Sequence, residues 1–127
     1  MKLPWIENYA GKWQDGEGRT IVITTQNDEK AKVDILLHGS PMIRPWCSNK
    51  PASRLLANYF PAQGPDLDVD LGRPGFSLNL SYECDDHKTP DEPEYLSVGV
   101  SPYENDEEVK HYIKLFGKLE SYKRAKV

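Results

Sequence analysis

Alternation of apolar and polar residues runs through most of the chain and predicts a series of short antiparallel strands. Residues 19–25 are rich in β-branched side chains, and residues 31–37 carry an apolar side chain at every second position. The polar residues 26–30 between them have the composition of a turn, so the two segments are expected to form a hairpin. Residues 12–14 precede this hairpin across the glycine-containing turn 15–18. We therefore predict a three-stranded meander at the start of the chain.

The same alternation returns in the second half of the sequence. In residues 66–71 leucine and valine alternate with aspartate, and in residues 76–82 apolar residues alternate with serine and asparagine. The glycine- and proline-containing residues 72–75 separate these segments, which predicts a second hairpin with one face in water. Residues 96–100 repeat the pattern after the acidic loop 85–94. These segments extend the predicted meander.

Two segments leave alternatives open. Residues 53–60 are short enough for a strand or for two turns of helix, and periodicity does not decide between them. In residues 102–124 a helical spacing of apolar residues competes with an alternation of period two. Gly117 would cost a helix interior about 1 kcal/mol, and the meander needs a closing partner for its edges. We therefore predict a final strand in this region.

A proline-rich segment, residues 39–52, interrupts the pattern and is predicted to be a long, partly ordered loop. It carries three large apolar side chains, Met42, Ile43 and Trp46, which a mere connector has little reason to carry. Exposed together, these side chains would form the edge of a ligand entrance or a docking surface. Folded back, they would plug an open end of the barrel instead.

A short motif lies directly ahead of the first predicted strand. Asn8 and Tyr9 precede the sequence Gly11-x-Trp13, and Arg124 lies near the end of the chain. This pattern resembles the opening of the lipocalins and related calycin barrels, in which a turn of helix leads to a G-x-W motif on the first strand. In that family the tryptophan closes one end of the barrel and a basic residue of the last strand packs across it. The resemblance implies these roles for Trp13 and Arg124.

Together, the alternation and the resemblance predict an all-β fold. We expect an antiparallel up-and-down meander that closes into a small calycin-like barrel, with a short N-terminal helical turn. Residues 1–127 are expected to form one domain, since hydrophobic residues make up 38% and aromatic residues 10% of the chain, enough for one small core.

Composition limits the cellular compartment and the classes of partner that we expect. No apolar run is long enough for a membrane span or a signal peptide, so we expect a cytoplasmic protein without membrane association. The net charge of -4 disfavours nucleic acid as a partner. Cys47 and Cys84 either form one disulfide or remain two thiols, and the missing export signal favours the thiols.

Residues with the spacing of a catalytic or metal site are sparse. The three histidines and two cysteines lie far apart in the sequence, without the spacing of metal ligands. Motifs for a nucleophilic serine or for phosphate binding are absent from the sequence. We therefore expect no metal and no cofactor, and rank an enzymatic function last.

A binding function is the remaining expectation. We expect the barrel to bind a small hydrophobic or amphipathic molecule without catalysis. The expected ligand-binding residues are Ile35, Met42, Ile43, Trp46, Leu78 and Leu80. The alternative is a protein-interaction module, such as a protease inhibitor, that presents a loop from a packed barrel to an unknown protein. Interior volume distinguishes the two, because eight strands enclose either side chains or one small ligand.

Overall fold

A closed antiparallel β-barrel forms the body of the protein. The computed structural model describes residues 6–44, 50–59, 66–70, 77–84, 94–101 and 121–125. Within these residues the barrel strands are β1 (Gly11–Gln14), β2 (Arg19–Thr25), β3 (Lys30–Leu37), β7 (Leu55–Tyr59), β8 (Asp66–Asp70), β9 (Ser77–Cys84), β10 (Glu94–Ser101) and β11 (Ser121–Arg124). Each strand pairs with the next one named, and β11 pairs with β1 to close the cylinder. The predicted all-β meander is confirmed.

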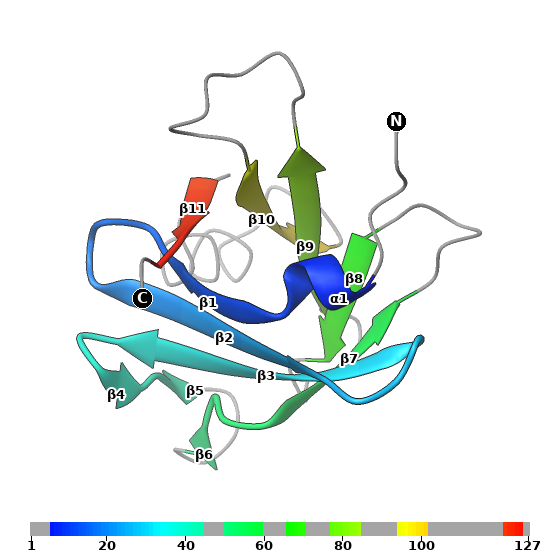
Figure 1. The fold of residues 1–127 in the computed structure, drawn as a ribbon. Helices are drawn as coiled ribbons and strands as arrows, with labels where there is room; N and C mark the ends of the chain where they lie inside the picture. The colour runs from blue at the N-terminus through cyan, green and yellow to red at the C-terminus, as the bar shows by residue number, and fades with distance from the viewer. Residues whose placement is uncertain are drawn as a thin grey trace.

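The two ends of the barrel differ. A single helical turn, α1 (Ile6–Tyr9), leads into β1, as predicted, and lies beside the strands that surround the interior (Figure 1). Because successive strands are antiparallel, their connections alternate between the ends. We call the end at which α1 enters β1 the α1 end. The opposite end, which carries the β1–β2 and β3–β7 connections, is called the far end.

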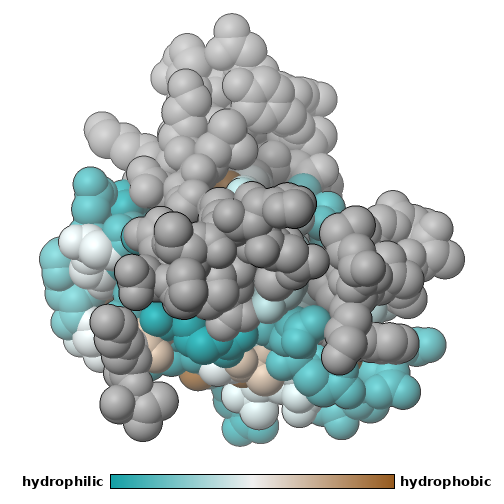
Figure 2. All heavy atoms as spheres, turned by 45° about the horizontal axis from the view of Figure 1, so that its top comes forward, coloured by the Kyte–Doolittle hydropathy of each residue, from teal (hydrophilic) through white to brown (hydrophobic). Residues whose placement is uncertain are grey.

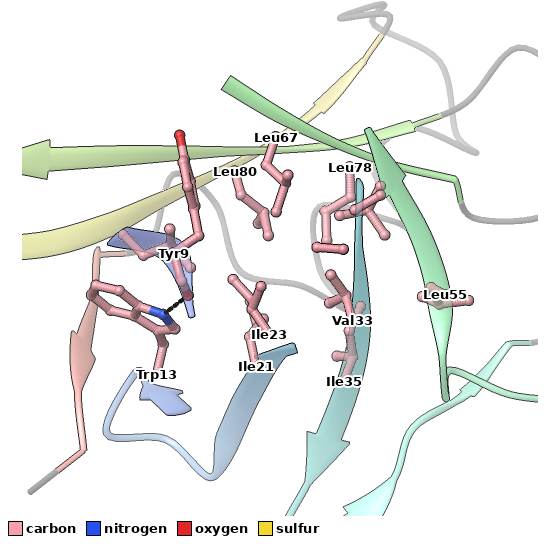
Figure 3. Close-up of a cluster of buried hydrophobic side chains, with 14 of the residues drawn as sticks. Tyr9, Trp13, Ile21, Ile23, Val33, Ile35, Leu55, Leu67, Leu78 and Leu80 are labelled. Atoms are coloured by element: carbon pink, nitrogen blue, oxygen red, sulfur yellow. Dashed lines mark hydrogen bonds between the residues drawn. The ribbon is translucent and has the colours of Figure 1, made fainter. Parts of the chain in front are cut away.

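Side chains alternate between a buried inner face and a more exposed outer face along the barrel strands with described side chains, except at Thr20 of β2, which is buried beside Ile21. On β3, Ala31, Val33 and Ile35 are buried, whereas Leu37, predicted on the same face, is 38% exposed because it lies at the rim where the strand ends. Inner-face side chains of opposite strands point toward a common interior in Figure 3. On the face that Figure 2 shows, the visible described residues are mostly hydrophilic, with small apolar patches among them. The core is therefore the inside of the barrel.

The structure decides the two ambiguous segments where it describes them. Residues 55–59 form strand β7, with Leu55, Ala57 and Tyr59 buried on the inner face, so the helical alternative is wrong there. Residues 121–124 form β11, which pairs with both β10 and β1. Residues 102–120 lie outside the described residues. No helix in the described part of the chain is long and apolar enough to cross a membrane.

The proline-rich segment contains more regular structure than the predicted loop. It forms three two-residue strands, β4 (Ser40–Pro41), β5 (Ile43–Arg44) and β6 (Lys50–Pro51). The β3–β4 hairpin turns through His38 and Gly39, whose φ angles are +52° and +84°. A two-residue hairpin loop of this kind requires positive φ, which glycine adopts without strain. The prolines are accommodated because these strands lie at the edge of the sheet or in a separate ribbon.

Candidate ligand-binding site

Trp13 and α1 close one end of the interior. Trp13 is fully buried on β1, and its indole Nε1 donates a hydrogen bond of 2.9 Å to the carbonyl oxygen of Tyr9 (Figure 3). The guanidinium carbon of Arg124 lies 4.2 Å from the centroid of the Trp13 ring, within the range of a cation–π interaction. β11 carries Arg124 to this place because its register sets Arg124 opposite Trp13. The structure thus brings together the two residues that the G-x-W resemblance paired.

Arg124 also joins the last strand to the end of α1. Its guanidinium donates hydrogen bonds of 2.6 Å to the carbonyl oxygen of Ala10 and 2.8 Å to that of Asn8. Carbonyl groups at a helix C-terminus have no partner within the helix, so a cation there is well placed. Gly11 lies next to this contact with φ of +126°, and a Cβ atom on it would be 2.6 Å from Arg124 Nη1. The backbone conformation thus favours glycine at this position, and any larger residue would also have to displace the Arg124 guanidinium from its present place.

Aromatic rings fill the rest of the α1 end. Ring centroids of Tyr9 and Tyr59 are 6.1 Å apart, those of Tyr9 and Tyr82 are 5.9 Å apart, and those of Trp13 and Tyr82 are 6.1 Å apart. The phenol oxygen of Tyr9 accepts a hydrogen bond of 3.0 Å from the backbone N–H of Tyr82. Burial raises the pKa of the Tyr9 phenol far above its usual value, so the ring stays uncharged. This end of the barrel is sealed by packed aromatics.

Aliphatic side chains line the interior beyond these rings. Three of the predicted ligand-binding residues, Ile35, Leu78 and Leu80, are buried on the inner faces of β3 and β9. The structure places these three residues in one core, which also contains Ile23 of β2 and Val33 of β3 (Figure 3). These three residues therefore belong to the buried core of the barrel.

One row of inner-face positions across β3, β7 and β8 carries small side chains. Ala31 is the cross-strand partner of Ala57, and Ala57 is the partner of Val69. All three residues are fully buried. We call these three the small-residue row. Sequence reasoning missed it, because the pairing of Ala57 depends on resolving residues 53–60 as a strand.

Met42 lies in a junction of three strand pairings at the far end. Three backbone hydrogen bonds form this junction. The N–H of Met42 donates to the carbonyl oxygen of Ile35 (2.8 Å), and the N–H of Ile35 donates to the carbonyl oxygen of Ala52 (2.8 Å). The N–H of Ala52 donates to the carbonyl oxygen of Met42 (2.6 Å). Met42 and Ala52 are buried in the core. Met42 is therefore folded back against the barrel and is not an exposed side chain of the rim. Ile43 lies in β5 with its side chain outside the description, and Trp46 lies outside the described residues.

A polar group lies on the inner face at the far end, where sequence reasoning placed no site residue. Asp15 Oδ2 and Arg19 Nη1 are 2.8 Å apart, and their side chains are 0% and 17% exposed. Asp15 Oδ1 also accepts hydrogen bonds from the backbone N–H groups of Glu17, over 2.8 Å, and Arg19, over 3.0 Å. Burial acts to raise the pKa of Asp15, but these hydrogen bonds and the Arg19 charge outweigh it, so the pKa lies below its usual value. The pair is therefore ionised at neutral pH.

Metal binding finds no support in the described part of the chain. No group of three histidine, cysteine or acidic side chains there is arranged to hold a metal ion. His38 is exposed at the β3–β4 turn, and Cys47, His87 and His111 lie outside the described residues, as does the Cys84 side chain. The question of a Cys47–Cys84 disulfide therefore falls outside the description.

Comparison with known proteins gives no relative for this chain: no family model, no curated protein and no solved structure matches it.

Proposed function

We propose that this protein is a calycin-like barrel that binds a small hydrophobic or amphipathic molecule in its interior. Eight strands enclose a space that either is filled by side chains or holds one small ligand. Bulky aromatic residues occupy the α1 end, whereas the interior beyond them is lined by aliphatic residues. The likeness of the Gly11, Trp13 and Arg124 arrangement to the lipocalin pattern supports the same assignment.

The small-residue row is the observation that carries this proposal. Ala31, Ala57 and Val69 project less far into the interior than leucine or phenylalanine would at the same positions, and they lie side by side on three neighbouring strands. A close-packed core ordinarily alternates large and small side chains across facing positions. The space in front of such a row can be filled by larger side chains of the opposite wall or by the apolar body of a ligand, and a ligand is the occupant that we propose.

Filling the row tests the proposal. Ala57→Leu adds an isobutyl group to the interior, while Asn58→Leu, the matched control, adds leucine to the outer face of the same strand. Wild type should enhance the fluorescence of the uncharged probe N-phenyl-1-naphthylamine saturably. Ala57→Leu should weaken binding at least about tenfold, equivalent to about 1.4 kcal/mol, and Asn58→Leu should leave it unchanged. Thermal unfolding of each variant checks that the barrel is intact.

Two results would contradict internal binding. One is a wild-type protein that does not change the probe's fluorescence. The other is equal binding by Ala57→Leu and wild type, which would place the probe on the surface. If Ala57→Leu does not fold, Val69→Ala, which enlarges the same wall, should alter the probe's affinity, and an unchanged affinity would equally count against the proposal.

A second candidate, an interaction module such as a protease inhibitor, is favoured by one observation. The ribbon of β5 and β6 branches from the barrel at the Met42 junction and lies below β3 in Figure 1. Its base is braced by Asp34, whose Oδ1 accepts hydrogen bonds of 2.9 Å from Ser53 Oγ and 2.8 Å from the backbone N–H of Arg54. A β-ribbon held on such a base is a suitable element to present to a partner.

Protease assays test this second candidate. The purified chain should inhibit at least one of a representative serine, cysteine and metalloprotease, and replacing residues 45–49 with glycine and serine should remove the inhibition. Lack of inhibition across the three classes would count against a protease inhibitor.

A further inference from the structure

Three residues on neighbouring strands form a polar row at the far end of the barrel, beyond the aliphatic side chains of its interior. Asp15 follows β1 directly opposite Arg19, since its backbone N–H donates a hydrogen bond of 3.2 Å to the Arg19 carbonyl. The pairing of Gln14 with Lys123 sets Asp15 beside Tyr122 on the other side. Arg19 shares the inner face of β2 with Ile21, and Tyr122 is buried in the core. We call Tyr122, Asp15 and Arg19 the polar row.

Two carboxylates of the described residues lie against the guanidinium of Arg19. Its Nη1 atom is 2.8 Å from Asp15 Oδ2 and 3.2 Å from Glu17 Oε2. The Asp15 side chain is fully buried, whereas that of Glu17 is 70% exposed. Coulomb interactions are stronger where water is excluded, so the buried Asp15 neutralises Arg19 far more effectively than Glu17 does. Tyr122 is near enough to Arg19 to be one of the groups that raise the pKa of its guanidinium, after the hydrogen bond to Asp15.

A third carboxylate would be repelled here. An anionic head group next to Arg19 would meet Asp15 at close range, in a place where solvent screens poorly. A hydroxyl or amide carries both donor and acceptor atoms and no net charge, so it can join a network of paired groups without this penalty. The polar row therefore selects by charge as well as by hydrogen bonding.

Resting on the internal binding proposed above, we propose that Asp15, Arg19 and Tyr122 receive the uncharged, hydrogen-bonding head group of an amphipathic ligand and exclude carboxylates. The ligand's apolar body then extends from the polar row toward the aliphatic interior. Asp15 is the residue that sets the specificity, because it cancels the charge that would otherwise attract a carboxylate to Arg19.

The wild-type test compares head groups on one alkyl chain. Octan-1-ol, octylammonium and octanoate are used to displace N-phenyl-1-naphthylamine at neutral pH and moderate salt. Octanol should displace the probe at a concentration at least about tenfold lower than octanoate. Octylammonium, which Asp15 does not repel, should also displace it at a lower concentration than octanoate does. Octylammonium and octanoate are both singly charged and have equal chain length, so their comparison isolates the sign of the charge.

Asp15→Asn tests the specificity directly. The amide oxygen of asparagine still accepts the two backbone hydrogen bonds, but the negative charge is gone, so Arg19 is left without its buried counter-charge. Displacement by octanoate should improve at least about tenfold relative to octanol. The matched control is Asp66→Asn, which makes the same charge change at an exposed position on the outer face of β8 and should leave the ratio unchanged.

The outcomes separate this inference from the proposal on which it rests. If wild type binds neither the probe nor the alkyl compounds, both fail. If the probe binds but octanoate displaces it as well as octylammonium does, the specificity inference alone is wrong. The specificity inference is also wrong if Asp15→Asn, like Asp66→Asn, leaves the ratio of the displacing concentrations of octanoate and octanol at its wild-type value. An Asp15→Asn protein that does not fold leaves the wild-type comparison as the deciding result.

Discussion

Replacing Trp13 with alanine should be among the most damaging single changes in this barrel. The side chain is fully buried, and truncation of a buried tryptophan typically costs about 3–5 kcal/mol through lost burial and the cavity left behind. Two further contacts disappear with it. The carbonyl of Tyr9 loses the indole donor at 2.9 Å, worth about 1 kcal/mol net, and Arg124 loses the ring beneath its guanidinium. We expect a loss of about 4 kcal/mol, near the middle of the general range.

Equilibrium unfolding in urea, followed by far-ultraviolet circular dichroism, measures this loss without depending on tryptophan fluorescence. Val22→Ala, a truncation on the outer face of β2 next to this strand, serves as the control and should cost less than about 1 kcal/mol. Trp13→Phe should fall between the two, since it keeps an aromatic ring but loses the N–H donor. A loss below about 1 kcal/mol for Trp13→Ala would refute the view that this residue seals the α1 end.

Two further perturbations test the same account elsewhere. Gly11→Ala should destabilise the protein by about 1–3 kcal/mol in thermal unfolding, because it combines a positive φ of +126° with a close approach to Arg124. Gly16→Ala, at a φ of +87° with open space around it, is the control and should cost less. Equal losses for the two variants would show that the approach to Arg124 does not matter. Because the pKa of Asp15 is lower in the folded chain than its usual 3.8, its ionised form stabilises the fold above that pH, and this contribution disappears as the pH falls through the lowered folded value. Urea unfolding from about pH 5 to about pH 2 should therefore show a shallower loss of stability for Asp15→Asn than for wild type, whereas parallel curves would contradict the assignment.

Most of the barrel can be predicted from the period-two pattern, because inner positions face the apolar interior and outer positions face water. Leu67 and Val69 alternate with aspartates for this reason, and their strand forms as predicted. The pattern weakens where a strand ends, which is why Leu37 lies at the rim although it continues the alternation. Residues 53–60 were ambiguous because so short a segment fits either period, and only the pairing of residues 55–59 with β3 and β8 decides in favour of a strand.

The candidate site was harder to predict from the sequence than the fold was. The ribbon of β5 and β6 is built from two-residue strands beside prolines, and its position depends on backbone hydrogen bonds among Ile35, Met42 and Ala52 that no periodicity encodes. The polar row joins residues more than one hundred positions apart, Asp15 and Tyr122, through closure of the barrel by β11. A hint was available in the turn 15–18, where an aspartate begins the turn and an arginine follows it at the start of the next strand.

Binding inside the barrel is the central claim, and methyl NMR of isoleucine-, leucine- and valine-labelled protein tests it most directly. Titration with N-phenyl-1-naphthylamine should shift the methyl resonances of inner-face residues Val69, Leu78 and Leu80, because these side chains are buried in the interior. The outer-face residues Val22 and Leu56 report on surface binding and should stay in place. Saturable shifts confined to the inner-face methyl groups are the result that internal binding predicts. Shifts confined to Val22 and Leu56, or no shifts at all, would contradict it.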